Sequence, residues 1–302
     1  MPPLFWTGKL TPLMKVLVNC NNLLAWMIGT AGDAAAMKER MKLGYEGAVS
    51  DDVTRYDELC LEVQTKSAIA QLEGIDPSGM EALDVGCGTG ILSFLLLERG
   101  ARKVVCGDIA EYMLDQARAK AAQMGYGEDR IAFRQLDAEA LPYEDNTFAF
   151  TITGMTSGLL PDLAKAIAEM ARVTKRGGLV GVGAHGYEHY WEPVDACFRA
   201  ITKRRILGYR IEYWPRKEKS VRKLMNKAGL VDIQMRRLFW RNTFRTGSEA
   251  YDFFAAVSSA WWYSKFPPDK IAKEADKARR YYERKNVTQI TDDVIVAYAR
   301  KP

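Results

Sequence analysis

Short apolar runs alternate with segments of helical spacing through the middle of the chain. Five of these runs have the length and the bounding turn residues of buried strands, and they lie at residues 82–85, 103–107, 131–136, 150–153 and 179–182. Helical spacing follows several of them, as in 91–97 and 160–173, and two further strands are expected at 231–238 and 294–299. Alternation of this kind predicts an α/β fold built on a mostly parallel sheet.

The first strand leads into a loop with three glycines at alternate positions, Gly86, Gly88 and Gly90. Glycine suits a loop that brings the backbone close to a nucleotide, because a Cβ would block the ligand and the turn needs unusual φ values. A dinucleotide fingerprint also places glycine or alanine three positions after the second glycine, and here that residue is Ile91. The spacing therefore argues against a dinucleotide site.

The second strand ends at Asp108, which lies about 20 residues beyond the glycines, where a carboxylate can accept hydrogen bonds from both hydroxyls of a ribose. Asp108 is thus the strongest single candidate for binding a nucleoside.

Three stretches resemble known motifs. Asp84 with the glycine loop resembles motif I of the class I S-adenosylmethionine-dependent methyltransferases. Residues 137–148, D-A-E-A-L-P-Y-E-D-N-T-F, resemble the segment between strands three and four of ubiquinone/menaquinone-type small-molecule methyltransferases, and T-K-R-G-G at 174–178 resembles the turn before strand five. The resemblance implies a doubly wound, mostly parallel seven-stranded sheet with an antiparallel last strand and helical lid additions. It also implies S-adenosylmethionine as cofactor.

The resemblance carries a set of cofactor-binding candidates, which are Asp84, Gly86, Cys87, Gly88, Gly90, Asp108, Ile109, Met113, Asp137, Ala138 and Thr153. Asp84 would orient the amino group of the cofactor, although a carboxylate at a strand end can also cap the next turn. Asp137 and Ala138 would hold the adenine edge. Met113 recurs with Leu114 and Ala117 at core spacing, so helix packing is its default role. Cys87 lacks an activating base nearby in the sequence and is interpreted as a small loop residue.

The fold needs less chain than is present, so the rest is interpreted as additions to it. We expect a helical extension or lid over residues 1–72 and a methyltransferase domain over 73–302, with lid insertions at about 186–222 and 240–290. In the resembling family the segment that corresponds to residues 38–72 folds over the cofactor, and a tyrosine in it often closes the pocket. The candidate substrate residues are Tyr45, Tyr56, Tyr187, Trp191 and Trp261. The alternatives are tyrosines that only pack on their domain and, for the aromatic helix expected at 248–264, a homodimer interface.

Both histidines of the chain, His185 and His189, follow strand five, at the edge where open α/β sheets bind ligands. Either could take a proton from a hydroxyl or thiol acceptor, since the ordinary pKa of histidine lies near neutrality. They could instead orient the substrate or simply be hydrogen-bonded. A zinc site is not expected, because no further ligands accompany this pair.

Charge is unevenly distributed along the chain. The net charge of the 302 residues is +5, yet residues 203–245 alone hold fourteen Lys or Arg against three acids. Such a stretch can attract RNA, an anionic bilayer or an acidic substrate, or it can be a solvated face, which is the favoured interpretation. Leu10, Leu13, Met14, Leu17 and Leu24 recur at helical spacing, so an amphipathic helix is expected there. It packs on its own domain in the favoured interpretation, and on a bilayer surface in the other.

Five scattered cysteines without paired spacing indicate a reducing compartment, and the cytoplasm is the expected location. The favoured function is methyl transfer from S-adenosylmethionine to a small, partly apolar molecule or lipid. An RNA or protein methyltransferase that uses the basic stretch is the alternative, and a non-catalytic cofactor-binding protein is the third hypothesis. A quinone ring acceptor is in doubt, because the arginine and asparagine that quinone methyltransferases place after strand four are absent from Thr153-Gly154-Met155-Thr156-Ser157.

Overall fold

The structure is a computed structural model that describes residues 7–27, 34–47, 54–201, 216–259 and 268–302. Its residues form two compact units. The sheet unit comprises Leu61–His185, Arg216–Leu238 and Val294–Pro302, and the helical unit comprises Met1–Cys60, Gly186–Pro215 and Phe239–Asp293. The lid role expected for residues 1–72 and for the insertions at about 186–222 and 240–290 stays a prediction.

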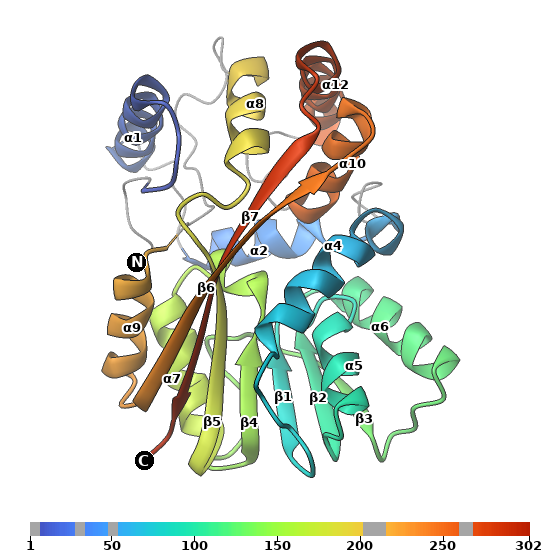
Figure 1. Cartoon of the computed structure of the whole chain (residues 1–302), viewed down its shortest axis with the longest axis vertical. Helices are drawn as coiled ribbons and strands as arrows, with labels where there is room; N and C mark the ends of the chain where they lie inside the picture. Colours follow the sequence, from blue (N-terminus) through green and yellow to red (C-terminus); the bar gives the residue numbers. More distant parts are fainter. Residues whose placement is uncertain (1–6, 28–33, 48–53, 202–215, 260–267) are drawn as a thin grey trace. The chain divides into compact units, whose positions relative to one another are not determined.

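A seven-stranded sheet in the order β3-β2-β1-β4-β5-β7-β6 organises the sheet unit (Figure 1). Its strands are β1 (Glu81–Val85), β2 (Lys103–Asp108), β3 (Ile131–Gln135), β4 (Phe148–Thr153), β5 (Thr174–His185), β6 (Val231–Thr243) and β7 (Gln289–Arg300). The first five strands pair in parallel, whereas β7 pairs antiparallel with β5. The predicted doubly wound sheet with an antiparallel last strand is confirmed.

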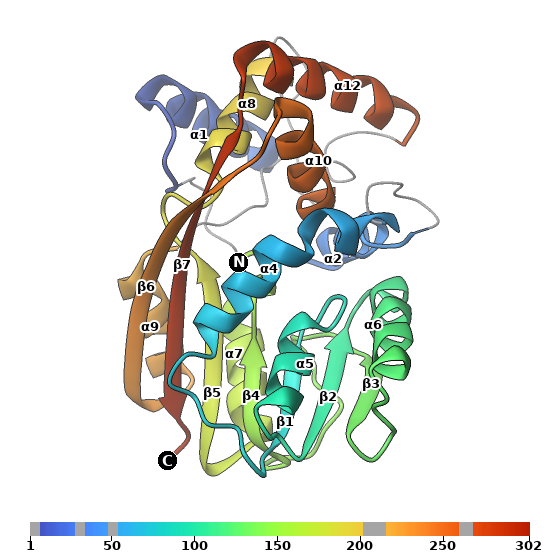
Figure 2. The same cartoon turned by 45° about the vertical axis from the view of Figure 1, so that its right-hand side comes forward.

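Helices cover both faces of this sheet. Figures 1 and 2 show α5 (Ile91–Glu98) and α6 (Glu111–Gln123) on one face, with α7 (Leu163–Val173) and α9 (Glu218–Lys227) on the other. Alternate residues of β5, such as Val180 and Val182, are buried in one core cluster with Ile167 and Met170 of α7. Because parallel strands are covered on both sides, their sequences read as nearly continuous apolar runs.

Three strands, β5, β6 and β7, extend well beyond their predicted bounds, and β7 begins at Gln289 instead of residue 294. The motif at 174–178 was predicted to be a turn, but β5 already begins at Thr174, which pairs with Phe148. The Thr174 hydroxyl lies 2.8 Å from the Thr151 hydroxyl, and the pairing is irregular between Phe148 and Phe150. This irregularity lets a glycine-containing segment stay in the sheet. Strand β6 likewise continues beyond its predicted end to Thr243.

The helical unit contains α1 (Pro12–Met27), α2 (Ala34–Gly44), α8 (Trp191–Ile201), α10 (Gly247–Val257) and α12 (Pro268–Lys285), and α4 (Tyr56–Gln71) begins in it. Helix α12 contacts both α8 and α10. The core of the helical unit is aromatic. The Tyr251 ring packs edge-on against the Tyr282 ring with 5.5 Å between the ring centres, and Phe198 and Phe253 are fully buried. The aromatic helix predicted at 248–264 is therefore α10 as far as Val257, and its side chains pack inside this unit.

Candidate functional site

The glycine loop after β1 has the backbone conformation that its sequence predicts. Gly86, Gly88 and Gly90 have φ values of 74°, 55° and 88°, in the left-handed region that side chains disfavour. A Cβ on Gly86 would lie 2.3 Å from Cγ2 of Thr156, and the Thr156 hydroxyl donates to the Gly86 carbonyl at 2.7 Å. A Cβ on Gly88 would meet nothing within 4 Å. A ligand can therefore approach the backbone at Gly88, whereas Thr156 already packs against the backbone at Gly86.

The Asp108 carboxylate lies at the tip of β2 and is fixed by two backbone groups. The Gly88 N–H donates to its Oδ2 at 2.9 Å, and the Ala110 N–H donates to its Oδ1 at 3.0 Å. A carboxylate can accept several hydrogen bonds at once, so vicinal hydroxyls of a ribose are suitable donors to it. The same contacts join the glycine loop to the end of β2.

Asp84 lies near the end of β1, and it is buried with 1% exposure. The Ser93 hydroxyl on α5 donates to its Oδ2 at 2.7 Å. Burial raises the pKa of Asp84 to about 7; the Ser93 hydrogen bond opposes this rise, and the nearby charge of Asp108 adds to it. A cationic amino group bound beside Asp84 would favour its ionised form.

Asp84 should make stability depend on pH in the protein without cofactor. The unfolded carboxyl ionises near 3.8, whereas the folded one stays protonated until about 7. We therefore expect the free energy of unfolding of the wild type to fall relative to that of Asp84→Asn between these two pH values, and the difference to be constant above them. Urea unfolding of both proteins in steps of pH checks this, and a difference that does not change with pH contradicts it.

The adenine-side candidates lie along the ends of β2 and β3. The Asp137 carboxylate accepts from the Glu139 N–H at 2.9 Å, and the Ala138 methyl group is buried in the core. Met113 is buried on the inner face of α6 with Leu114 and Ala117. Ile109 is half-buried directly after β2. The packing expected of Met113 is thus present, while contacts of these residues to adenine stay predictions.

Cys87 is a poor nucleophile in this environment. Its side chain is buried, and burial together with the adjacent Cys106 and the carboxyls of Asp108 and Asp84 raises the pKa of its thiol. A raised pKa suppresses the thiolate, which is the reactive form. The arrangement agrees with the interpretation of Cys87 as a small loop residue.

S-adenosylmethionine fits the chemistry of these groups. The Asp108 carboxylate can accept from the ribose hydroxyls, and the amino end of α5, where Gly90 provides no side-chain cap, can receive a carboxylate. Thr153 ends β4 with a fully buried hydroxyl that has no hydrogen-bond partner within the described part of the chain. Buried polar atoms are normally paired, so this hydroxyl is available to a ligand at the same edge of the sheet.

His185 is the last residue of β5 and belongs to the sheet unit. Its side chain is buried, and its ring lies so close to Gly158 that a Cβ there would be 1.8 Å from Nδ1. Burial, with the charge of Arg216, lowers the pKa of His185 to about 3. The imidazole is therefore neutral at neutral pH and a weak base, which favours an orienting role over proton transfer. A catalytic role for His185 stays a prediction.

His189 lies in the turn after β5 and belongs to the helical unit. Its Nδ1 accepts from the Asp293 N–H at 3.2 Å, and its ring stacks on that of Tyr190 at 3.9 Å. These contacts give His189 a structural role in its own unit, and its catalytic role is likewise only predicted. Across the described residues, no group of three or more His, Cys, Asp or Glu side chains could hold a metal ion.

The candidate substrate residues of the described ranges all lie in the helical unit. The Tyr45 hydroxyl donates to the Val257 carbonyl at 2.8 Å, and Tyr56 is half-buried at the start of α4. The Lys15 ammonium lies 5.5 Å from the Tyr187 ring centre, and the Lys9 ammonium lies 4.9 Å from that of Trp191. Trp261 lies outside the described residues. A substrate role for these side chains stays a prediction.

Two surface features were also predicted. Helix α9 turns Lys219, Arg222, Lys223 and Lys227 outward, so this part of the basic stretch is a solvated face. Leu10, Met14 and Val18 are buried. Helix α1 nevertheless exposes several apolar side chains of the expected stripe and beyond it, namely Leu13, Val16, Leu17, Leu24, Trp26 and Met27. No described helix combines the length and apolar character that a membrane span needs. Contact with a bilayer or with RNA stays a prediction.

Sequence reasoning missed two residues that hold the loop in place. Ser93 interrupts an apolar helix on its buried side, which is a signal that a polar partner lies opposite. Thr156 contacts Gly86 across a separation of 70 residues, and nothing in the local pattern indicates that contact.

Comparisons with known proteins agree with this geometry. Residues 82–178 match the family model described as a methyltransferase domain. A demethylmenaquinone methyltransferase of Clavibacter sepedonicus is 28% identical over 224 residues, covering 68% of this chain and 86% of the relative. That of Staphylococcus aureus strain MRSA252 is 39% identical over 104 residues, and the match spans 34% of this chain and only 42% of that protein.

Solved structures share the fold at low sequence identity. The YcgJ protein of Bacillus subtilis superposes with a TM-score of 0.53 at 17% identity, covering 78% of this chain and 98% of that protein. The [4+2]-cyclase SpnF has a TM-score of 0.54 at 21% identity, covering 80% of this chain and 82% of that protein. At these identities the likeness establishes the fold alone.

The glycine loop, the fixed carboxylate at the tip of β2, the sheet order and the match over residues 82–178 agree with one another. Residues 82–178 form a methyltransferase domain with the Rossmann-like fold, and the sequence of the chain is similar to that of the demethylmenaquinone methyltransferases.

Proposed function

We propose that the protein transfers the methyl group of S-adenosylmethionine to a small, partly apolar organic molecule by in-line displacement. The observation that carries the proposal is the Asp108 carboxylate, held by the Gly88 and Ala110 N–H groups beside an open glycine loop. The demethylmenaquinone methyltransferases among the relatives support a small-molecule acceptor.

When bound, the cofactor supplies a sulfonium that already carries an activated methyl group. The protein then has to bind the cofactor, position the acceptor and exclude water, and it needs a base only where the acceptor is protonated. Asp108 and the glycine loop would bind, Asp84 would receive the amino group, and the neutral His185 would orient the acceptor. This division of roles requires no nucleophilic residue.

A transfer assay tests the proposal more sharply than binding alone, since the shared fold includes a [4+2]-cyclase. The protein is incubated with S-adenosylmethionine labelled in its methyl group and with separate pools of small aromatic alcohols, amines and quinols, of RNA and of protein. We expect label in the small-molecule pools. Label in RNA that is retained in a salt-dependent manner would favour the basic stretch, and binding without transfer to any pool would favour a non-catalytic role.

A further inference from the structure

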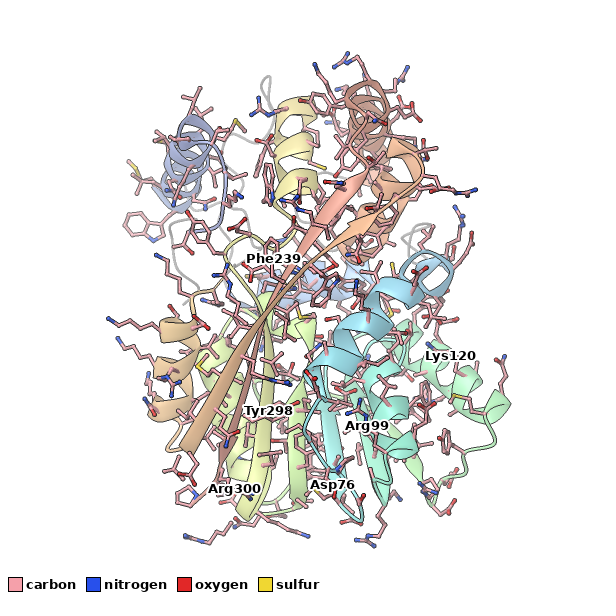
Figure 3. All side chains as sticks on the ribbon, in the orientation of Figure 1. Asp76, Arg99, Lys120, Phe239, Tyr298 and Arg300 are labelled. Atoms are coloured by element: carbon pink, nitrogen blue, oxygen red, sulfur yellow. The ribbon has the colours of Figure 1, made fainter. Side chains whose placement is uncertain are left out.

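Gln71 is the last residue of α4, and its position is fixed within the sheet unit. The hydroxyl of Tyr298 on β7 donates to the Gln71 carbonyl at 2.7 Å, and the Arg99 guanidinium donates to the next carbonyl, that of Leu72. Figure 3 labels both Tyr298 and Arg99. The last carbonyls of a helix lack partners in the helix, so these two bonds hold the end of α4 in place.

The orientation of the Gln71 side chain is fixed as well. Its Nε2 donates to the carbonyl and to the hydroxyl of Ser67, both at 3.3 Å. A carbonyl oxygen can only accept, so the amide nitrogen must face Ser67 and the amide oxygen must face away from it. This oxygen, Oε1, is buried, and Gln71 as a whole is only 3% exposed. Oε1 has no hydrogen-bond partner among the residues that the structure describes.

Oε1 faces the edge of the sheet where the cofactor residues gather. A Cβ on Gly183 of β5 would lie 2.1 Å from it, so only glycine leaves room for the amide at this point. A Cβ on Gly154, directly after β4, would lie 3.9 Å from Oε1 and 3.7 Å from Leu92 in the first turn of α5. Gly154 thus lies between this oxygen and the Leu92 side chain of α5, and the oxygen itself lies beside the carboxyl ends of β4 and β5.

We propose that Gln71 determines acceptor specificity: its Oε1 accepts a hydrogen bond from a hydroxyl or N–H group of the acceptor molecule. The inference rests on the proposed function and deepens it. A buried amide oxygen that is held in advance favours a ligand that can donate, and it disfavours ethers and carboxylates, which can only accept. The neighbours of Oε1 on this side, Leu92, Gly154 and Gly183, bring no polar side-chain atom to it.

Matched pairs of small probes test the inference. The protein is loaded with S-adenosylhomocysteine and titrated with phenol against anisole, 1-naphthol against 1-methoxynaphthalene, and aniline against N,N-dimethylaniline. We expect the donor of at least one pair to bind about tenfold more tightly, the ratio that one buried hydrogen bond supports. In Gln71→Met the ratio of the two dissociation constants of that pair should be about tenfold smaller than in the wild type. Comparing ratios between proteins cancels the difference in hydrophobicity within each pair.

The controls separate binding from folding. Gln71→Met removes a buried oxygen without a partner, which favours folding, but also the two 3.3 Å hydrogen bonds from Nε2 to Ser67, so its Tm should change little. The loss of a residue that only holds the fold together would lower the Tm. Gln71→Asn keeps the amide but withdraws its oxygen from the site, so this variant should also lose the preference for the donor probe. Gln123→Met makes the same exchange at an exposed position and should keep the preference of the wild type for the donor probe.

Three outcomes overturn the inference: equal ratios in wild type and Gln71→Met, a large loss of Tm in both Gln71 variants, or no donor probe binding at millimolar concentration. Failure of the wild type to bind S-adenosylhomocysteine would overturn the proposed function itself, which is a different result. If the protein binds S-adenosylhomocysteine but does not prefer the donor probes, only the role proposed for Gln71 is contradicted, and the proposed function stands.

Discussion

Replacing Asp108 by alanine should weaken the binding of S-adenosylmethionine by about 100-fold or more. The carboxylate would accept two hydrogen bonds from the ribose, and a hydrogen bond to a charged group contributes about 1.5–3 kcal/mol. The variant also releases the Gly88 N–H, so the glycine loop loses its tie to β2. Calorimetric titration of both proteins with S-adenosylmethionine measures the effect.

Asp129→Ala is the matched control for this experiment, since Asp129 is exposed in the turn before β3. It should bind the cofactor as the wild type does. Unchanged affinity in Asp108→Ala would contradict the role given to this carboxylate. A similar loss in both variants would point to a general effect of the mutations.

The glycine loop should separate stability from binding in a second pair of variants. Gly86→Ala places its Cβ against Thr156 and is strained at φ 74°, so we expect a large loss of stability. Gly88→Ala meets no protein atom and bears only the strain of its positive φ, about 1–2 kcal/mol. Its main effect should be a loss of cofactor affinity of about tenfold or more, because the new methyl group occupies the face that the ligand approaches.

Gly125→Ala isolates the strain. Gly125 has φ 76° in an exposed turn, and a Cβ there also meets nothing within 4 Å. It should lower Tm about as much as Gly88→Ala does and leave cofactor binding intact. Thermal unfolding and calorimetry of the three variants check this, and a Gly88→Ala protein that binds as tightly as Gly125→Ala would refute the assignment of the open face.

The parts of the fold that local sequence encodes were predicted. The strand, the alternate glycines and the carboxylate at Asp108 lie within one βαβ unit, where spacing along the chain sets spacing in the structure. The doubly wound sheet, the likeness to the methyltransferases and the helices α5 and α7 followed from patterns of the same kind.

Contacts between distant segments could not be read from these patterns. Gln71 meets Gly183, and Thr156 meets Gly86, only because the sheet brings them together. The irregular pairing that draws Thr174 into β5 likewise depends on its neighbour β4. In α1 the helical spacing indicated a helix, but it could not tell that Leu13 and Leu17 would be exposed while Met14 is buried.

A crystal structure with S-adenosylhomocysteine tests the central claim most directly. We expect density for the nucleoside along the carboxyl edge of the sheet, with both ribose hydroxyls within hydrogen-bond distance of the Asp108 carboxylate and the backbone of Gly88 facing the ligand. A nucleoside bound elsewhere, or one whose ribose makes no contact with Asp108, would contradict the account.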